Sequence, residues 1–158
     1  MKTKKLNPIK SFLTTILNFC LFKIHFPKNY NGKTITTSDN KNFTIFRHVI
    51  VGNKKDLKKE KGTVFIVKFK LAKMSVEKNK RFSLFPIPMF IGLPGFRAKF
   101  WLADNETGYN KGIYQWKTKQ DAINYSQSFA VDFMTKRSEE NTVSVEIIPD
   151  TNIYNFIQ

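Results

Sequence analysis

The residue types that most often carry out chemistry are sparse in this chain of 158 residues. It has two histidines, His25 and His48, and one cysteine, Cys20, all within the first 48 residues. A histidine base in the second half, a cysteine metal site and a Ser/His/Asp triad are therefore disfavoured. Gly92-Leu93-Pro94-Gly95 lacks the Gly-Lys-Ser/Thr that completes a phosphate loop. We expect no cofactor, with neither a metal nor haem required.

Aromatic side chains are abundant instead, and Phe alone occupies 16 positions. Most of them fit a hydrophobic core. If they leave a cavity, it suits a flat, apolar small molecule oriented by a few polar groups. The aromatic residues considered for such a cavity are Phe82, Phe85, Phe90, Phe96, Trp101, Tyr114, Trp116, Phe129 and Phe133.

The pattern of apolar residues and caps predicts an α+β domain with a split βαββαβ, ferredoxin-like core and an antiparallel sheet. Ser75 and Thr118 are the expected helix caps, and no regular structure is expected over the prolines of 86–94. We divide the chain into an N-terminal helix (1–27), extra strands with a mobile Lys-rich loop (28–61) and the core (62–158). The predicted strands are 33–37, 42–51, 63–71, 96–103, 111–117 and 143–148, and the core helices are 75–84 and one that buries Ala122, Tyr125, Phe129, Ala130 and Phe133.

Alternation along the strands predicts two unlike faces of the sheet. In the strand 96–103, Phe96, Phe100 and their alternating neighbours would face the helices. Arg97, Lys99 and Trp101 would then lie on the opposite face, which is consistent with solvent, with a nucleic acid or with a second subunit. We favour a homodimer through this mixed face, because a clear RNA-binding signature is missing and nucleic acid is therefore disfavoured.

The hairpin region resembles a known family. Pro94-Gly95-Phe96 with Lys99 and Trp101, then Glu106-Thr107-Gly108, then Gly112-Ile113-Tyr114 with Trp116, is similar to the YdhR-type group of the dimeric α/β-barrel superfamily. That superfamily includes antibiotic-biosynthesis monooxygenases and haem-degrading enzymes, and the resemblance spans about residues 62–149.

The resemblance implies a homodimer of ferredoxin-like subunits and a cofactor-independent, monooxygenase-like activity on an aromatic substrate. A polar group would have to lie beside a bound phenol, and Lys99, Trp101 and Tyr114 are the catalytic candidates. The haem-degrading branch uses a histidine ligand, which residues 62–149 lack. Substrate contacts are expected from Asn79, Phe82, Phe96, Trp116, Phe129 and Phe133.

The first half of the chain is strongly basic. Residues 1–81 hold 20 Lys and Arg against four acids, a net of +16, whereas residues 82–158 hold seven against eight. An amphipathic helix is expected over 8–24, flanked by Lys2, Lys4 and Lys5. Its apolar face predicts either an anionic membrane surface or the domain's own core as its partner.

Two functions are consistent with these patterns. One is a small-molecule-binding, oxygenase-like enzyme, and the other is a non-catalytic dimeric module peripheral to anionic membranes. The apolar stretch of the N-terminal segment is too short to span a bilayer. The predicted location is the cytoplasm, with the membrane surface as the place of the second function.

Overall fold

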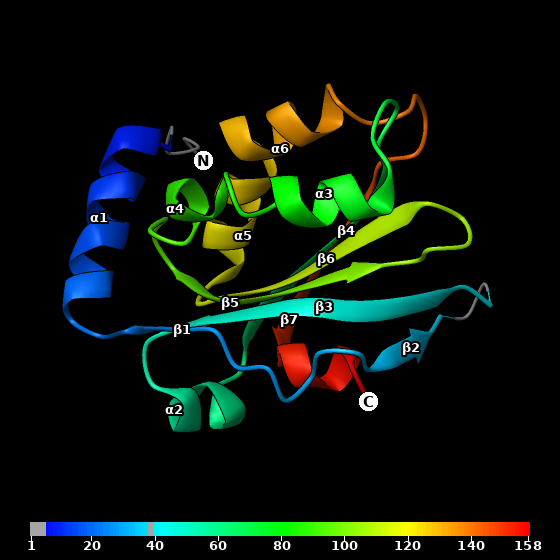
Figure 1. Ribbon diagram of the computed structural model, residues 1–158. Helices are drawn as coiled ribbons and strands as arrows, with labels where there is room; N and C mark the ends of the chain where they lie inside the picture. Colours follow the sequence, from blue (N-terminus) through cyan, green and yellow to red (C-terminus); the bar gives the residue numbers. More distant parts are fainter. Residues whose placement is uncertain (1–5, 38–39) are drawn as a thin grey trace.

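The computed structural model describes residues 6–37 and 40–158 (Figure 1). Lys2, Lys4 and Lys5 lie outside the described residues. The elements in chain order are α1 (Pro8–Cys20), β1 (Ile24–His25), β2 (Thr34–Thr36), β3 (Asn42–Val51), α2 (Lys54–Lys59), β4 (Gly62–Lys70), α3 (Val76–Phe82), α4 (Ile87–Phe90), β5 (Phe96–Ala103), β6 (Tyr109–Trp116), α5 (Lys119–Ser126), α6 (Phe129–Thr135), β7 (Ser144–Thr151) and the 3₁₀ helix η1 (Ile153–Phe156).

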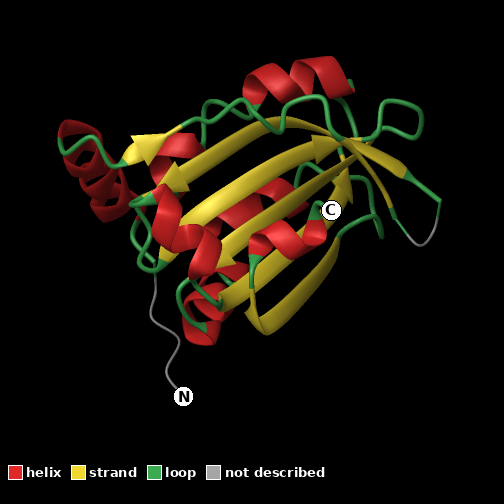
Figure 2. Ribbon diagram, turned by 90° about the horizontal axis from the view of Figure 1, so that it is seen from below, coloured by secondary structure: helices red, strands yellow, loops and turns green. Residues whose placement is uncertain are grey.

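The described strands form one antiparallel sheet in the order β1-β3-β5-β6-β4-β7, with β2 paired to β3. Within it, β4-α3-β5-β6-α5-β7 is the predicted split βαββαβ core, so the α+β, ferredoxin-like prediction is confirmed. The sheet is open and is not closed into a barrel (Figure 2). Helices α3 to α6 cover one face, and α2 and η1 lie against the other (Figure 1).

The predicted caps hold their helices. The Ser75 side chain accepts from the Lys78 amide, and that of Thr118 accepts from the Asp121 amide. Pro94-Gly95 makes the predicted turn, in which Gly95 adopts a φ of +77° and the Phe96 amide donates to the Leu93 carbonyl.

Four local predictions are wrong. The helix expected over 8–24 ends at Cys20, and Ile24–His25 forms strand β1 instead. The Lys-rich segment between Gly52 and Gly62 is not a bare loop, because Asn53 caps α2 and the fully buried Leu57 anchors it. The proline segment contains the short helix α4. The helix after Thr118 breaks at Ser128, so Phe129 begins a separate helix, α6.

The face opposite the helices is apolar rather than mixed. Ile66, Phe100 and Ile113 belong to a second core, which is closed by the buried side chains of η1 and α2. A homodimer remains a prediction that one chain does not test. The surface expected for it is covered by the chain's own C-terminal residues, with Ile153 fully buried there.

Candidate functional site

A β-bulge in β5 decides which side chains enter the site. Phe96 pairs with Trp116, but Ala98 pairs with the preceding residue, Gln115, so Arg97 is an extra residue in the strand. The bulge reverses the alternation, and Lys99 and Trp101 therefore face the helices, on the same side as Phe96. The predicted position of Lys99 and Trp101 on the opposite face is wrong for this reason.

The bulge is held on its outer side by an ion pair. The Arg97 guanidinium donates to one Glu60 carboxylate oxygen from Nε at 3.0 Å and from Nη2 at 2.7 Å. Glu60 is the C-terminal cap residue of α2, which places this helix end beside the bulge. The side chain of Arg97, the extra residue, is thus bound to the C-terminal end of α2.

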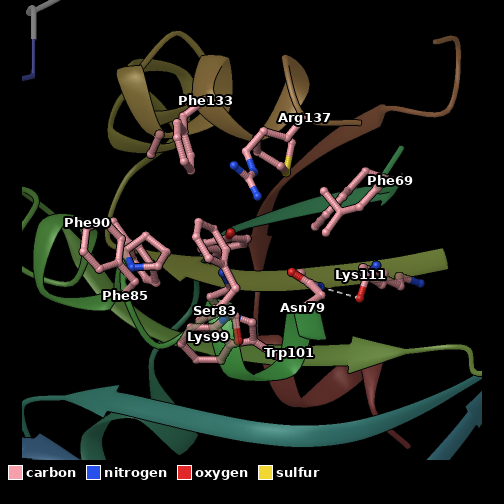
Figure 3. Close-up of a pocket in the computed structure, with 18 of the residues that line it drawn as sticks. Phe69, Asn79, Ser83, Phe85, Phe90, Lys99, Trp101, Lys111, Phe133 and Arg137 are labelled. Carbon is pink, nitrogen blue, oxygen red and sulfur yellow. Dashed lines mark hydrogen bonds between the residues drawn. The ribbon is translucent and has the colours of Figure 1, made fainter. Parts of the chain in front are cut away.

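A cavity of about 370 Å³ lies between the helix-facing side of the sheet and the helices above it (Figure 3). Its floor comes from β4, β5 and β6, and its walls come from α3, the segment entering α4, α4 itself, and α5 and α6. Most of its lining is apolar. The principal lining residues are Phe46, Phe69, Asn79, Phe82, Ser83, Phe85, Met89, Phe90, Lys99, Trp101, Asn110, Tyr114, Phe129, Phe133 and Arg137.

The Lys99 amine lies among three aromatic rings at the cavity floor. Its Nζ is 4.2 Å from the ring centre of Trp101, 4.3 Å from that of Tyr114 and 4.6 Å from that of Phe90. Within the described part of the chain, no carboxylate lines the cavity, and Lys99 makes neither an ion pair nor a hydrogen bond. The amine is therefore available to a bound molecule.

Burial sets the charge state of this amine. Loss of water around the side chain lowers the Lys99 pKa well below its ordinary value, and the nearby Arg47 guanidinium lowers it further. The three ring faces favour the ammonium form and offset part of this effect. No carboxylate in the cavity lining compensates the loss of water, so burial favours the neutral form of this amine.

Polar side chains fix other parts of the wall. The buried Asn79 amide donates to the Asn110 side-chain oxygen at 2.7 Å. The Arg47 guanidinium donates to Ser83 Oγ at 2.6 Å and to the Lys80 carbonyl at 2.9 Å, and so ties β3 to α3. These hydrogen bonds fix the orientation of the wall side chains. They also satisfy polar groups that would otherwise hydrogen-bond to a ligand.

Two tyrosines, Tyr114 of β6 and Tyr125 of α5, meet where the floor of the cavity joins its wall. The Tyr125 hydroxyl donates to the Tyr114 hydroxyl at 3.0 Å, and both side chains are buried. Burial raises the pKa of both phenols, that of Tyr114 well above its usual value. Tyr114 therefore remains protonated, and its hydroxyl can donate to a ligand oxygen.

Arg137 is a second cation at the cavity. Its guanidinium lies over the ring of Phe82 at 4.4 Å and that of Phe133 at 5.3 Å. Figure 3 shows it directed from the α6 side toward the cavity interior. Its Nε has no hydrogen-bond partner among the described residues. Arg137 thus adds a second cationic group to the cavity lining, on the side opposite the strands.

The structure brings together seven of the nine site residues predicted from the sequence. Lys99, Trp101 and Tyr114 are at the floor, and Asn79, Phe82, Phe129 and Phe133 line the walls. Phe96 and Trp116 pack against each other in the core, with ring centres 5.5 Å apart, and do not line the cavity. Whether the seven act as predicted remains a prediction.

Sequence reasoning missed Arg137, Phe69 and Ser83 as site residues. Arg137 follows the last turn of α6, where a basic residue is ordinarily explained by the helix dipole. Phe69 lies on the same side of β4 as the core residues Phe65 and Val67, as the alternation of a strand requires. That signal could have identified it.

The lining offers neither an imidazole nor a thiolate to an iron atom. His48 lies on the opposite face, stacked on Phe100 with ring centres 3.9 Å apart. His25 is in β1, and Cys20 is exposed at the end of α1. Among residues 6–37 and 40–158, no group of three or more His, Cys, Asp or Glu side chains could hold a metal ion. The cavity residues therefore do not supply the histidine ligand of the haem-degrading branch.

Comparison with solved structures identifies the fold. An uncharacterised ferredoxin-fold protein from Listeria monocytogenes, related to antibiotic biosynthesis monooxygenases, aligns with a TM-score of 0.54 and 10% identity over 72% of this chain. A monooxygenase-like protein from Listeria innocua aligns at 0.53 and 11% over the same share. This chain has their ferredoxin-like, monooxygenase-type fold.

A haem-degrading enzyme from Listeria monocytogenes has the same fold, with a TM-score of 0.51 and 11% identity, over 80% of this chain and 96% of the other. This chain spans 66% of the length of each of the first two, just under two thirds. No protein-family model and no curated protein sequence matches the chain. At these identities the likeness establishes the fold, and chemistry has to be argued from the cavity.

Proposed function

We propose that the cavity binds a flat, apolar small molecule that carries an acidic or strongly polar oxygen, and that Lys99 is the group that acts on it. The observation behind the proposal is the Lys99 amine, held by three ring faces with no carboxylate in the lining. Aromatic walls match an apolar ring system, and the neighbouring Lys99 and Tyr114 suit one oxygen-rich edge of it. Arg137 adds a second cation elsewhere in the lining.

The reaction that fits this site is a cofactor-independent oxygenation of an aromatic substrate. The neutral Lys99 amine would take a proton from an acidic CH₂ or phenol of the substrate. The resulting ammonium would lie over the three rings, and the substrate anion would remain next to it. Molecular oxygen then accepts electrons from this anion, and a CH₂ group with O₂ gives a ketone and one water.

Lys99 suits the base role for an energetic reason. A base must be unprotonated before the reaction and must tolerate the charge that it gains. Burial favours the unprotonated amine. The cation–π contacts stabilise part of the positive charge that the amine gains. The apolar walls exclude water, which would otherwise protonate the substrate anion.

The test uses dithranol, a hydroxyanthrone with an acidic CH₂, as the probe. We expect the full chain to consume oxygen with it faster than the uncatalysed reaction does, and Lys99→Met to lose at least tenfold of that excess. Lys117→Met, which removes an exposed lysine beyond β6, is the matched control and should retain it. Equal rates for the chain and for buffer, or for the chain and Lys99→Met, would contradict the oxygenase proposal.

Binding is measured separately from turnover. Without oxygen, dithranol should quench the fluorescence of Trp101, which lines the cavity, and Trp101→Phe should abolish most of that response. Saturable quenching without oxygen uptake would favour the alternative, a non-catalytic binding module. The absence of quenching would overturn the assignment of the cavity as a binding site.

A further inference from the structure

Helix α1 packs on the domain with its polar side. Ser11 and Thr15 are its two buried residues, and the Thr15 hydroxyl donates to the Pro88 carbonyl in α4 at 2.8 Å. Gly92 makes the close approach possible, because a Cβ at that position would collide with the Ser11 carbonyl oxygen. Of the two partners predicted for the apolar face of α1, the domain's own core is therefore not the one that it contacts.

The apolar face of α1 and of the chain after it points away from the domain. Phe19 is 72% exposed and Phe22 is 87% exposed, whereas an ordinary surface helix would bury such residues. Figure 1 shows α1 at one end of the molecule, beside α4. The exposed apolar residues that form this surface are Ile9, Phe12, Leu13, Ile16, Leu17, Phe19, Leu21, Phe22 and Phe26.

The charge around this surface is of one sign. Residues 6–37 contain Lys10, Lys23, Lys28 and Lys33 and no Asp or Glu. Lys10 and Lys23 are near the two ends of α1 and are exposed. Such a surface is complementary to an apolar layer that lies beneath negative head groups.

We propose that the outward face of α1, with the turn up to Phe26, docks on a bilayer that contains anionic lipid, with the helix lying in the interface plane. None of the helices in the described ranges is long and apolar enough to cross a bilayer. A second copy of the chain is a poorer occupant, because it would bring the same lysines against this surface. The proposal is independent of the chemistry of the cavity.

The test uses the full chain and sedimentation with two kinds of vesicle, pure phosphatidylcholine and an equal mixture of phosphatidylcholine and phosphatidylserine. We expect at least tenfold tighter binding to the mixed vesicles, and loss of most of this preference at high salt. Failure of the full chain to bind mixed vesicles at low salt would overturn the proposal.

Two sets of variants separate the apolar and the charged contributions. Phe12→Ser, Phe19→Ser and Phe22→Ser together should weaken binding at least tenfold, and Lys23→Glu with Lys28→Glu should abolish the preference for anionic vesicles. Val145→Ser, which changes an exposed apolar residue of β7, is the control and should bind like the wild type. These side chains are exposed, so the melting temperature should be unchanged in every variant.

Self-association is the competing outcome. If sedimentation velocity shows a dimer that the three Phe→Ser substitutions convert into a monomer, and vesicle binding is the same with and without them, the surface is an interface between copies and the lipid proposal is wrong. Point variants are preferred to deletion of residues 1–24, because deletion would also remove the Ser11 and Thr15 packing on α4.

Discussion

At the scale of single residues, Lys99 combines burial with the absence of a counter-ion. Such an arrangement costs stability, because the unfolded chain holds a proton that the folded chain gives up. With a folded pKa below the ordinary 10.5, stability rises as the pH is raised toward that value. A residue that weakens the fold and lies in a cavity is typical of a functional group.

We therefore predict that Lys99→Met raises the melting temperature at neutral pH while it removes activity. Met keeps the length of the side chain and has no charge to desolvate. Each kcal/mol regained raises the melting temperature of a domain of this size by about 2–4 °C. Calorimetry of Lys99→Met beside Lys117→Met checks this, and a lower melting temperature for Lys99→Met alone would contradict it.

His48 makes a second prediction at this scale. It is buried between Phe100 and Tyr30, neither ring nitrogen has a partner among the described residues, and burial lowers its pKa to about 3. Between about pH 6.5 and about pH 3 the unfolded chain binds a proton that the folded chain does not. The free energy of unfolding therefore decreases as the pH is lowered, by up to about 1.4 kcal/mol per pH unit.

His48→Phe should remove this part of the acid sensitivity. Urea unfolding at about pH 7 and at about pH 5 gives the measurement, and the variant should lose less stability between the two than the wild type does. Parallel losses in the two proteins would show that His48 does not control the response.

At the scale of elements, strands and helix caps were predictable from the sequence, and β3 and β5 have the predicted bounds. Alternation, β-branched residues and capping side chains are local signals. The face of Lys99 was not predictable, because the bulge at Arg97 depends on pairing with β6 and on Glu60. The candidate site was thus found by residue type, while its position in the fold required the tertiary structure.

The C-terminal 3₁₀ helix is the element whose role the sequence concealed. The Ile153 amide donates to the Gln115 side-chain oxygen at 2.7 Å, and Ile153 itself is fully buried. The residues of η1 and those after it are too few to show a periodic pattern of apolar residues that would indicate packing. Within the described chain they complete the second core.

Ile153→Ala should therefore cost about 2–5 kcal/mol of the free energy of unfolding, the range for large-to-small changes in a core. Val145→Ala, at an exposed position of β7, should change it by less than about 0.5 kcal/mol. Urea denaturation of the two variants tests the difference. Equal effects would mean that η1 is only loosely held.

At the scale of the whole molecule, both faces of the sheet are covered within one chain. Helices α3 to α6 cover one face, and η1 with α2 covers the other (Figure 1). A homodimer, if it forms, must use another surface while η1 stays in place. Covering both faces is also the means by which an open sheet keeps its apolar residues from water.

Removal of residues 152–158 should uncover Phe100, Ile66 and their neighbours and cause self-association. We expect the truncated chain to sediment as a larger species than the full chain at the same micromolar concentration. Equal sedimentation together with an unchanged melting temperature would contradict the closing role of η1.

The extra residue at Arg97 also affects how this chain can be compared with others. A two-residue repeat that gains one residue continues with inverted phase, so every position from Ala98 to Ala103 faces the side that simple counting assigns to its neighbour. In a relative without the extra residue, the same residue types would face the opposite side of the sheet. Alignment of such chains by their apolar pattern would pair Lys99, which lines the cavity, with a residue of the core on the opposite face. Deletion of Arg97 alone would move the Lys99 amine out of the cavity.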